Sequence, residues 1–341
     1  MKKIILKEPV DGAVVPLLPR YISEYLTGGK PIAAAGGSVD WSSPELEGVE
    51  RAHPLPVTLR FRADGIDDPC RVLLSERPDF AGAMEKVTRL RSACFDNLKA
   101  GTEYYWKAES GSCSSPVFTF TTDSAAPRLI HADGVSNVRD LGAWPTRSGR
   151  AIRQGMIYRG GEMDVHQKIT AAGKKVFLAD LGIRTDLDFR GEVADRIHIS
   201  ALGTGVNRVF IPCCAYREFL LREYGSALRA IFSVFADPAA YPIYMHCWGG
   251  ADRTGTVAFL LEALLGVADE NLMQDYELTT FSIWGARTRS VLQFRQFLLT
   301  LDRYGSAPGA SYADKAEACL RDAGVTQDEI SAIRALLLEG V

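Results

Sequence analysis

The sequence predicts two successive folds: a small all-β sandwich over residues 1–125 and an α/β domain with a parallel central sheet over residues 126–341. Two observations predict this division. Short alternating apolar segments fill the first third of the chain, and strands alternate with helices after it. Between them, TDSAAPRLIHADGV at 122–135 is rich in Pro, Ala and Ser, which is typical of a domain boundary.

The bulk composition is that of an ordinary globular protein. Of the 341 residues, 47% are hydrophobic and 24% are charged, so a packed core is expected. The formal net charge of -3 predicts no broad basic surface, which disfavours nucleic acid and anionic membranes as partners. Apolar runs all fall short of the ~18 residues that a membrane span needs.

The N-terminal stretch and the cysteines bear on the compartment. MKKIILKEPVDG starts like a secretion signal, but Lys7, Glu8 and Pro9 interrupt its apolar part, so we expect a first strand. The seven cysteines are scattered and lack CxxC pairs, which disfavours a disulfide framework or a zinc site. A reactive thiol among them favours a cytoplasmic location. If a signal peptide precedes this sequence, the expected location is periplasmic or secreted instead.

The first domain is predicted as a sandwich of short strands. In PVTLRFR at 56–62, the side chains of Val57, Leu59 and Phe61 share one face. Further strands are expected, at intervals typical of a sandwich, at 9–15, 70–76, 86–92, 103–110 and 117–122. The Gly- and Ser-rich insertion at 28–54 is expected to be a long loop.

One corner of this domain resembles fibronectin type III domains. In NLKAGTEYYWKAES at 97–110, a leucine, a turn and Gly-Thr lead into a strand. The resemblance implies that the hydroxyl of Tyr104 bonds back to upstream backbone, with Trp106 and Ala108 on the same face. It implies a fibronectin type III-like sandwich that could dock a protein partner.

Helices and strands alternate in the second domain. TAAGKKVFLADLG begins a helix at Thr170, with Leu178 and Leu181 inward and Gly182 at its end. The remaining elements are expected as strands at 183–191, 206–212 and 242–246 and as helices at 217–236, 254–265, 269–280, 285–304, 312–323 and 326–339. This alternation favours an α/β layer with a parallel core.

The strongest functional signal is YMHCWGGADRTG at 244–255, a strand, a loop and the start of an apolar helix. The first helical turn offers free N–H groups and the positive end of a dipole, which favour an anion. Gly249 and Gly250 permit a loop whose amides surround an oxyanion, and Arg253 can hold two of its oxygens. The same field favours the thiolate form of Cys247.

This arrangement predicts covalent phosphoryl transfer. The thiolate of Cys247 attacks phosphorus and expels an alkoxide or phenolate, while the amides and Arg253 stabilise the equatorial oxygens. Water then hydrolyses the phosphocysteine. The arginine and the amides take the role of Mg²⁺ in other phosphoryl transfers, so no metal and no cofactor are expected.

HCWGGADRTG at 246–255 resembles the signature loop of cysteine-dependent protein tyrosine phosphatases, HC-x5-R-[ST]. Its Asp-Arg pair resembles the atypical bacterial branch, HC-x-x-G-x-D-R-T-G. The segments 137–163, which begins NVRDLG, and 180–195, DLGIRTDLDFRGEVAD, are similar to further motifs of that branch. The resemblance covers about residues 128–341 and implies a cysteine-phosphatase-like parallel sheet flanked by helices.

We expect a distinct role for each of several residues in and beside this loop. Cys247 is the expected nucleophile and Arg253 the phosphate clamp, and Thr254 is expected to hydrogen-bond the thiolate. His246 is expected to fix the loop from behind. The phosphate-binding residues are expected to be Trp248, Gly249, Gly250, Ala251, Asp252, Thr254 and Gly255.

The general acid stays open among three aspartates, because the chain has no WPD sequence. Asp252, inside the loop, is the first candidate, although its role could instead be to brace the loop. Asp188 is the second and could simply pair with Arg190. Asp140 is the third and, with Arg139, is expected to support the loop. Arg159 is expected to be structural, and Glu192 could orient basic groups.

The substrate is predicted from what surrounds the loop. Ala251 stands where relatives that accept phosphoinositides often carry lysine, which weakens the case for inositol phosphates. Trp248 offers an aromatic wall for a phenyl phosphate, or is a packed loop residue. Three further arginines are expected on the pocket side, or on a solvated face: Arg287, Arg289 and Arg295.

The leading hypothesis is a phosphomonoesterase acting on phosphotyrosine-type substrates, with a phosphoprotein or small phosphomonoester as partner. One alternative is a dual-specificity or inositol/lipid phosphate phosphatase. Another is a non-catalytic phosphate-binding or adhesion protein, and a third is a sulfur-transfer enzyme that uses the same thiol.

Overall fold

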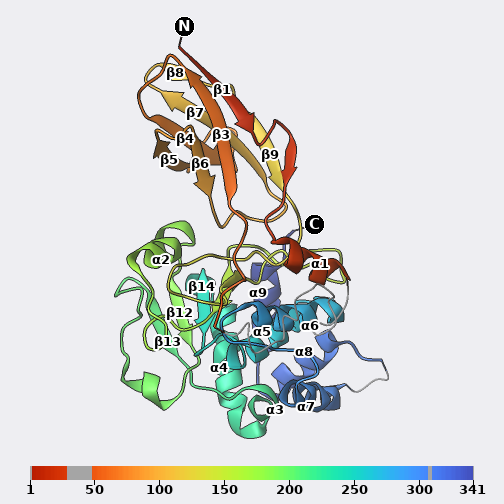
Figure 1. Cartoon of the computed structure of the whole chain (residues 1–341). Coiled ribbons are helices and arrows are strands. Elements are labelled where there is room, and N and C mark those ends of the chain that lie inside the picture. The colour runs from red at the N-terminus through yellow and green to blue at the C-terminus, as the bar shows by residue number, and fades with distance from the viewer. Residues whose placement is uncertain (1, 29–47, 306–308, 341) are drawn as a thin grey trace. The chain divides into compact units, whose positions relative to one another are not determined.

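The computed structural model describes residues 2–28, 48–305 and 309–340, and the chain forms two compact units (Figure 1). The first unit comprises Met1–Arg20 and Pro54–Arg128, and the second comprises Tyr21–His53 and Leu129–Val341. The division therefore differs from the expected one, in which residues 21–53 belong to the sandwich. No helix in the described part of the chain combines the length and apolar character that a membrane crossing requires.

The first unit contains two β-sheets. A three-stranded antiparallel sheet has the order β1 (Lys3–Glu8), β3 (Val57–Asp64), β6 (Ser92–Phe95). The second sheet has the order β2 (Ala13–Val15), β9 (Phe118–Thr122), β7 (Glu103–Ser110), β4 (Cys70–Ser75), β5 (Met84–Thr88), and β8 (Cys113–Ser114) pairs with β7. The single strand expected at 86–92 is wrong, because the chain turns between β5 and β6 with Arg91 at a φ of 58°.

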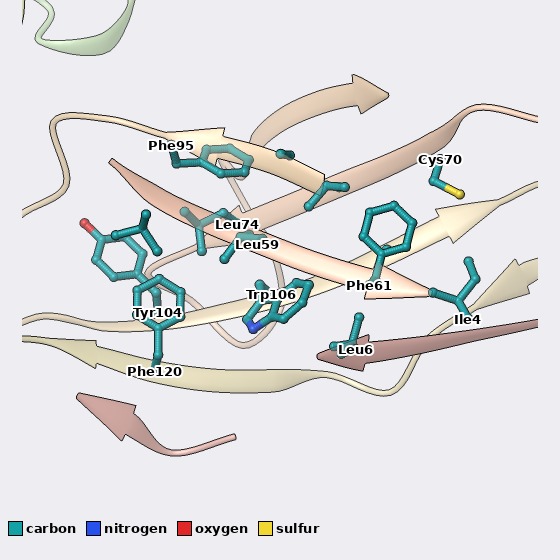
Figure 2. Packing of buried hydrophobic residues seen from close by; sticks show 14 of the residues in the cluster. Ile4, Leu6, Leu59, Phe61, Cys70, Leu74, Phe95, Tyr104, Trp106 and Phe120 are labelled. Carbon is teal, nitrogen blue, oxygen red and sulfur yellow. The ribbon is translucent and has the colours of Figure 1, made fainter. Parts of the chain in front are cut away.

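The core of the first unit lies between these sheets (Figure 2). The side chain of Trp106 is fully buried, and the rings of Tyr104 and Phe120 stack with their centroids 5.5 Å apart. The backbone N–H of Lys99 donates a hydrogen bond of 3.0 Å to the hydroxyl of Tyr104. This is the expected bond of that tyrosine to upstream backbone, and the fibronectin type III likeness itself stays a prediction.

The second unit is built around a five-stranded sheet. Its order is β10 (Arg139–Asp140), β11 (Ile157–Gly160), β14 (Ile243–His246), β12 (Thr185–Asp188), β13 (Asn207–Phe210). The last four strands run parallel, and β10 is antiparallel to β11. Because β14 lies in the middle, Cys247 emerges from the carboxyl end of the central strand, where α/β sheets place their ligands.

Helices surround this sheet (Figure 1). The α-helices are α1 (Arg20–Gly28), α2 (Ala171–Lys175), α3 (Tyr216–Phe219), α4 (Gly225–Ala236), α5 (Arg253–Leu264), α6 (Asp269–Leu278), α7 (Leu292–Leu301), α8 (Tyr312–Asp322) and α9 (Gln327–Leu337). Shorter turns are η3 (Val176–Asp180), η4 (Glu192–Arg196), η5 (Arg222–Tyr224), η6 (Pro238–Ala240), η7 (Thr279–Phe281) and η8 (Asp302–Tyr304).

The helix expected to begin at Thr170 changes its winding halfway. Thr170 caps α2 by accepting a hydrogen bond from the N–H of Gly173, and a π-helical turn, η3, follows. The wider turn shifts the phase of the side chains, so Phe177 is fully buried while Leu178, expected to point inward, is 43% exposed. Leu181 is buried as expected.

Helix α5 has no solvent-facing side. All its residues from Thr254 to Leu264 are buried, and it contacts α6, α8 and strands β11 and β14. A helix that is apolar nearly all round has to be enclosed by other elements. This enclosure fixes the amino terminus of α5 at the end of β14, where the loop lies.

Candidate active site

The loop Cys247–Asp252 joins the central strand β14 to the enclosed helix α5. The side chain of Cys247 is 5% exposed, at the point where the strand ends. Both flanking elements are buried, so neither end of the loop is free to move. The sequence therefore predicts the position of this loop correctly, because an apolar strand and an apolar helix bracket it.

The carbonyl oxygens of the loop are held from outside by the surrounding scaffold. The oxygen of Trp248 accepts a hydrogen bond of 3.0 Å from the N–H of Glu162. The oxygen of Gly249 accepts one of 3.0 Å from Nδ2 of Asn137.

The next carbonyl, that of Gly250, accepts a hydrogen bond of 2.7 Å from Nη2 of Arg159. In a planar trans peptide the C=O of one residue and the N–H of the next point in opposite directions. The N–H groups of Gly249, Gly250 and Ala251 therefore face away from the scaffold. A series of convergent N–H groups of this kind forms an anion-binding nest.

Two glycines make this close packing sterically feasible. Gly250 has a φ of +65°, and a Cβ at this position would lie 2.1 Å from the carbonyl oxygen of Gly160. A Cβ on Gly249 would lie 2.9 Å from the ring of Trp284. Side chains at either position would push the loop off its supports, which explains the glycine pair.

Two side chains at the start of α5 have polar atoms without partners. Nη1 of Arg253 and Oγ1 of Thr254 are both buried and make no hydrogen bond within the described residues. Buried polar atoms normally have partners, and an orphaned one often marks a ligand site. Arg253 and Thr254 thus provide a guanidinium N–H and a hydroxyl at the start of α5, directly after the loop.

His246 lies behind the loop in a buried ion pair. Its Nε2 is 2.8 Å from Oδ1 of Asp186, which also accepts a hydrogen bond of 2.6 Å through Oδ2 from Ser200. Burial opposes the charge of His246, but the carboxylates of Asp186 and Asp188 outweigh it and raise its pKa to about 9. A protonated imidazole behind Cys247 adds positive charge to the site.

Two buried arginines support the other side of the loop. Asp275 accepts hydrogen bonds of 2.8 Å from Nε of Arg139 and 2.5 Å from Nη1 of Arg159. Burial and the neighbouring Arg139 lower the pKa of Arg159 to about 10, which leaves it charged at neutral pH. Gly255 makes room for this guanidinium, because a Cβ there would lie 3.2 Å from Nη2 of Arg159.

Asp252 lies at the rim of the loop and is engaged by two side chains. Its Oδ1 accepts a hydrogen bond from the hydroxyl of Tyr216 and one of 2.9 Å from Nε of Arg287. Its side chain is 41% exposed. Of the three arginines expected on the pocket side, Arg287 therefore reaches the loop, whereas Arg289 pairs with carboxylates of α6.

The other two candidate acids are tied into the scaffold. Asp188 is buried and pairs with Arg190 and with Arg208, at 2.8 and 2.6 Å. Burial would raise the pKa of Asp188, but the hydrogen bonds from Arg190 and the charge of His246 lower it well below its usual range. Asp140 accepts hydrogen bonds from the backbone N–H groups of residues 142 and 155.

Two tryptophans occupy positions that the sequence does not reveal. The ring of Trp248 packs 4.8 Å from the ring of His166 and lies beneath the guanidinium of Arg190. The wall against the loop is formed by Trp284, whose ring contacts Gly249. Nothing in the local sequence distinguishes Trp284, since it reaches the loop only through tertiary packing. The side chain of Glu192 lies outside what the structure describes.

Asn137 and Glu162 are further site residues without an assigned role in the sequence. Both lie in the segment 137–163, so its resemblance to a family motif is the signal that could have found them. Asn137 adopts a left-handed φ of 62°, which directs its carboxamide to the loop. Arg139 also donates a hydrogen bond of 2.6 Å to its Oδ1, so the orientation of the carboxamide is fixed.

Two similar proteins match part of this chain. A protein from Cupriavidus necator, named "Putative tyrosine-protein phosphatase", is 30% identical over an alignment of 168 residues, and the match covers 42% of this chain. The chain spans 60% of the length of that relative. A solved structure, the core catalytic domain of the PP-IP phosphatase SIW14 from S. cerevisiae in complex with citrate, is 16% identical with a TM-score of 0.31. The match covers 46% of this chain and 85% of that one.

The family model described as "Tyrosine phosphatase family" matches residues 130–339. This range includes β10–β14, the loop at Cys247 and helices α2–α9. The match covers more than half of the 341 residues. The chain belongs to the tyrosine phosphatase family.

Proposed function

We propose that the chain is a cysteine-dependent phosphomonoesterase that hydrolyses phosphotyrosine-type substrates through a phosphocysteine on Cys247. One observation carries this proposal: the loop turns its carbonyls to the scaffold and its N–H groups to the opposite side, beside a cysteine and a buried, unpartnered guanidinium N–H of Arg253. A dianionic phosphate matches this set of donors in charge and geometry.

In the first step, the thiolate of Cys247 attacks phosphorus and the bond to the leaving oxygen breaks. The amides of the loop and Arg253 stabilise the negative charge on the three equatorial oxygens. The leaving oxygen takes a proton from a general acid, for which we propose Asp252, the aspartate at the rim of the loop. Its carboxyl group is partly exposed, whereas Asp188 and Asp140 are fully buried.

In the second step, water attacks the phosphocysteine and the sulfur leaves as a thiolate. The carboxylate of Asp252 is then the base that takes a proton from this water. In this proposal the hydroxyl of Thr254, which is buried and has no partner in the described residues, donates a hydrogen bond to the sulfur and eases its departure. His246, held by Asp186, keeps positive charge behind the sulfur throughout.

The charges around the loop support a monoester over a more highly charged substrate. Arg287 pairs with Asp252 when this carboxylate is ionised, and Arg289 pairs with Glu270 and Glu277. Ala251 provides no cation where a lysine would stand. With these arginines paired, the site has little spare positive charge for the additional phosphates of an inositol polyphosphate.

The proposal is tested by hydrolysis of p-nitrophenyl phosphate in the presence of EDTA. The wild-type protein is expected to be active and to be inhibited by vanadate, and Cys247→Ser is expected to abolish turnover. Cys94→Ser, at an exposed cysteine of the first unit, is the matched control and is expected to retain activity. Activity that needs a metal, or that survives in Cys247→Ser, contradicts the proposal.

The remaining alternatives have distinct outcomes in the same preparation. Tungstate binding without turnover identifies a non-catalytic phosphate-binding protein. Persulfide formation with thiosulfate identifies a sulfur-transfer enzyme. A side-by-side panel of phosphotyrosine peptides, phosphoserine peptides and phosphoinositides then separates the substrate classes, and we expect the phosphotyrosine peptides to give the highest kcat/KM.

A further inference from the structure

A short segment that precedes the family match forms part of the second unit. Residues 48–53, here called the strap, run beside the chain that follows α6. The N–H of Gly48 donates a hydrogen bond of 3.0 Å to the oxygen of Ile283, and the N–H of Arg51 donates one of 2.7 Å to that of Phe281. The strap is therefore fixed to the segment that leads into Trp284.

The strap places one carboxylate inside the second unit. Glu50 accepts hydrogen bonds from the hydroxyl of Ser136, from the N–H of Asn137 at 3.2 Å and from the N–H of Ala52 at 3.1 Å. Burial raises the pKa of Glu50, and the hydrogen bond from Ser136 is the strongest opposing influence. A half-buried carboxylate that accepts this many hydrogen bonds is a firm anchor for the backbone that supplies them.

Glu50 thus reaches the phosphate loop through a single intermediate residue. The backbone N–H of Asn137 is bound to Glu50, and its side chain binds the carbonyl of Gly249. Asn137 also has a left-handed φ of 62°, a conformation that asparagine adopts more readily than most non-glycine residues. Its hydrogen bond to Glu50 is one of the contacts that hold this backbone in place.

The strap also supports the wall on the opposite side of Gly249. Its backbone holds Phe281 and Ile283, and the ring of Trp284 follows directly against Gly249. Helix α1, which precedes the strap in the chain, adds the rings of Tyr21 and Tyr25 against Phe281, with centroids 5.7 and 6.2 Å apart. The hydrogen bond from Asn137 and the ring of Trp284 therefore both act on Gly249, and both are supported by residues 21–53.

We propose that Glu50 is a positioning residue of the phosphate cradle, which acts through Asn137 to fix the peptide of Gly249. This inference rests on the proposed function, since it assumes that the loop binds an oxyanion. Turning the Gly249 carbonyl toward Asn137 turns the next N–H toward the ligand. Without the hydrogen bond from Asn137, the peptide of Gly249 becomes ordered only when the oxyanion binds. The free energy that this ordering costs lowers the affinity for the oxyanion.

The test measures tungstate affinity by calorimetry together with turnover of p-nitrophenyl phosphate. The substitution Glu50→Gln turns one carboxylate oxygen into an NH₂ group and removes the negative charge, so Ser136 and Asn137 lose the charged acceptor that they share. We expect the tungstate Kd to rise about tenfold, the effect of one such lost bond. Glu317→Gln, which breaks the ion pair with Arg334 between α8 and α9, is the matched control and is expected to keep the wild-type Kd.

A double-mutant cycle separates positioning from general destabilisation. Asn137→Gly removes the carboxamide and tolerates the left-handed backbone. If Glu50 acts through Asn137, the two substitutions together raise the Kd hardly more than Asn137→Gly alone. If their effects on the Kd multiply fully, or if Glu50→Gln binds tungstate as the wild type does, the inference is wrong.

Two further outcomes have defined meanings. If Glu50→Gln does not fold, Ser136→Ala removes one donor of the same anchor, and we expect it to raise the Kd about threefold; an unchanged Kd in that variant overturns the inference. A wild-type protein that neither binds tungstate nor turns over substrate contradicts the proposed function itself, and the role of Glu50 is rejected with it.

Discussion

Arg159 donates a hydrogen bond of 2.7 Å from Nη2 to the carbonyl oxygen of Gly250, while its Nη1 binds the buried carboxylate of Asp275. One guanidinium therefore links the phosphate loop to helix α6. Arg139 binds the same carboxylate, so two buried cations depend on one anion.

The first prediction concerns this shared anion. Asp275→Asn leaves two buried guanidinium groups without their counter-charge, and breaking a buried ion pair costs about 3–5 kcal/mol. We expect a loss of this size in the free energy of unfolding, measured by urea denaturation. Glu317→Gln removes a partly exposed pair and is expected to cost under about 1 kcal/mol. Equal losses in the two variants contradict the argument.

The second prediction concerns pH. The pKa of His246 is raised to about 9 in the folded chain, above its ordinary value of 6.5. Its contribution to stability is therefore fully present below pH 6.5 and is lost as pH rises through 9. We expect the free energy of unfolding of the wild type to exceed that of Asp186→Asn by up to about 3 kcal/mol at pH 6.

This difference is expected to shrink as the pH approaches 9.5, because the imidazole then loses its proton in both proteins. The measurement is a series of urea denaturations between pH 6 and pH 9.5. A stability difference that stays constant over that range shows that the histidine is neutral in the folded protein.

The third prediction uses a pair of glycines with the same backbone angle. Gly250 and Gly182 both have a φ of +65°. A Cβ on Gly250 would lie 2.1 Å from the carbonyl oxygen of Gly160, whereas a Cβ on Gly182 would have no atom within 4 Å. Gly182→Ala is expected to cost about 1–2 kcal/mol of stability through backbone strain alone, with activity retained. Gly250→Ala is expected to abolish both tungstate binding and turnover, measured on folded protein.

The fourth prediction tests the general acid. If Asp252 protonates the leaving oxygen, Asp252→Asn lowers kcat for phenyl phosphate by about 10²–10⁴, and by much less for p-nitrophenyl phosphate, whose leaving group needs little protonation. Arg287→Met removes the ion pair of Asp252 but leaves its carboxyl group. It is expected to change both substrates by the same factor. Equal losses for both substrates in Asp252→Asn assign this aspartate to bracing the loop.

The sequence is informative about this site where its signals are local. The apolar strand at 243–246, the glycine pair and the apolar helix are contiguous, and each restricts the conformation of the next. The position of the loop at the end of a central parallel strand follows from this order of elements. The roles of Cys247 and Arg253 in catalysis stay predictions until the variants are measured.

The sequence is uninformative about the supports of the loop, because these are separated widely along the chain. Asn137 and Gly249, for example, are 112 positions apart, and Glu50 and Asn137 are 87 apart. For Trp248 the sequence leaves open an aromatic wall or a packed loop residue, and the structure packs its ring against that of His166. The wall is Trp284, which only tertiary packing brings to the loop.

Because the chain contributes residues 21–53 to the second unit before it completes the first, the protein cannot be truncated at a single point without loss to one unit. A cut at residue 125 separates the second unit from α1 and the strap, which are encoded upstream of Pro54. A fragment restricted to the family-matched range would retain every residue of the cradle and yet lack Glu50 and both tyrosines on Phe281. Truncation for crystallisation or screening is therefore expected to yield a weakened enzyme, and adding residues 21–53 as a separate peptide offers a direct route to complementation.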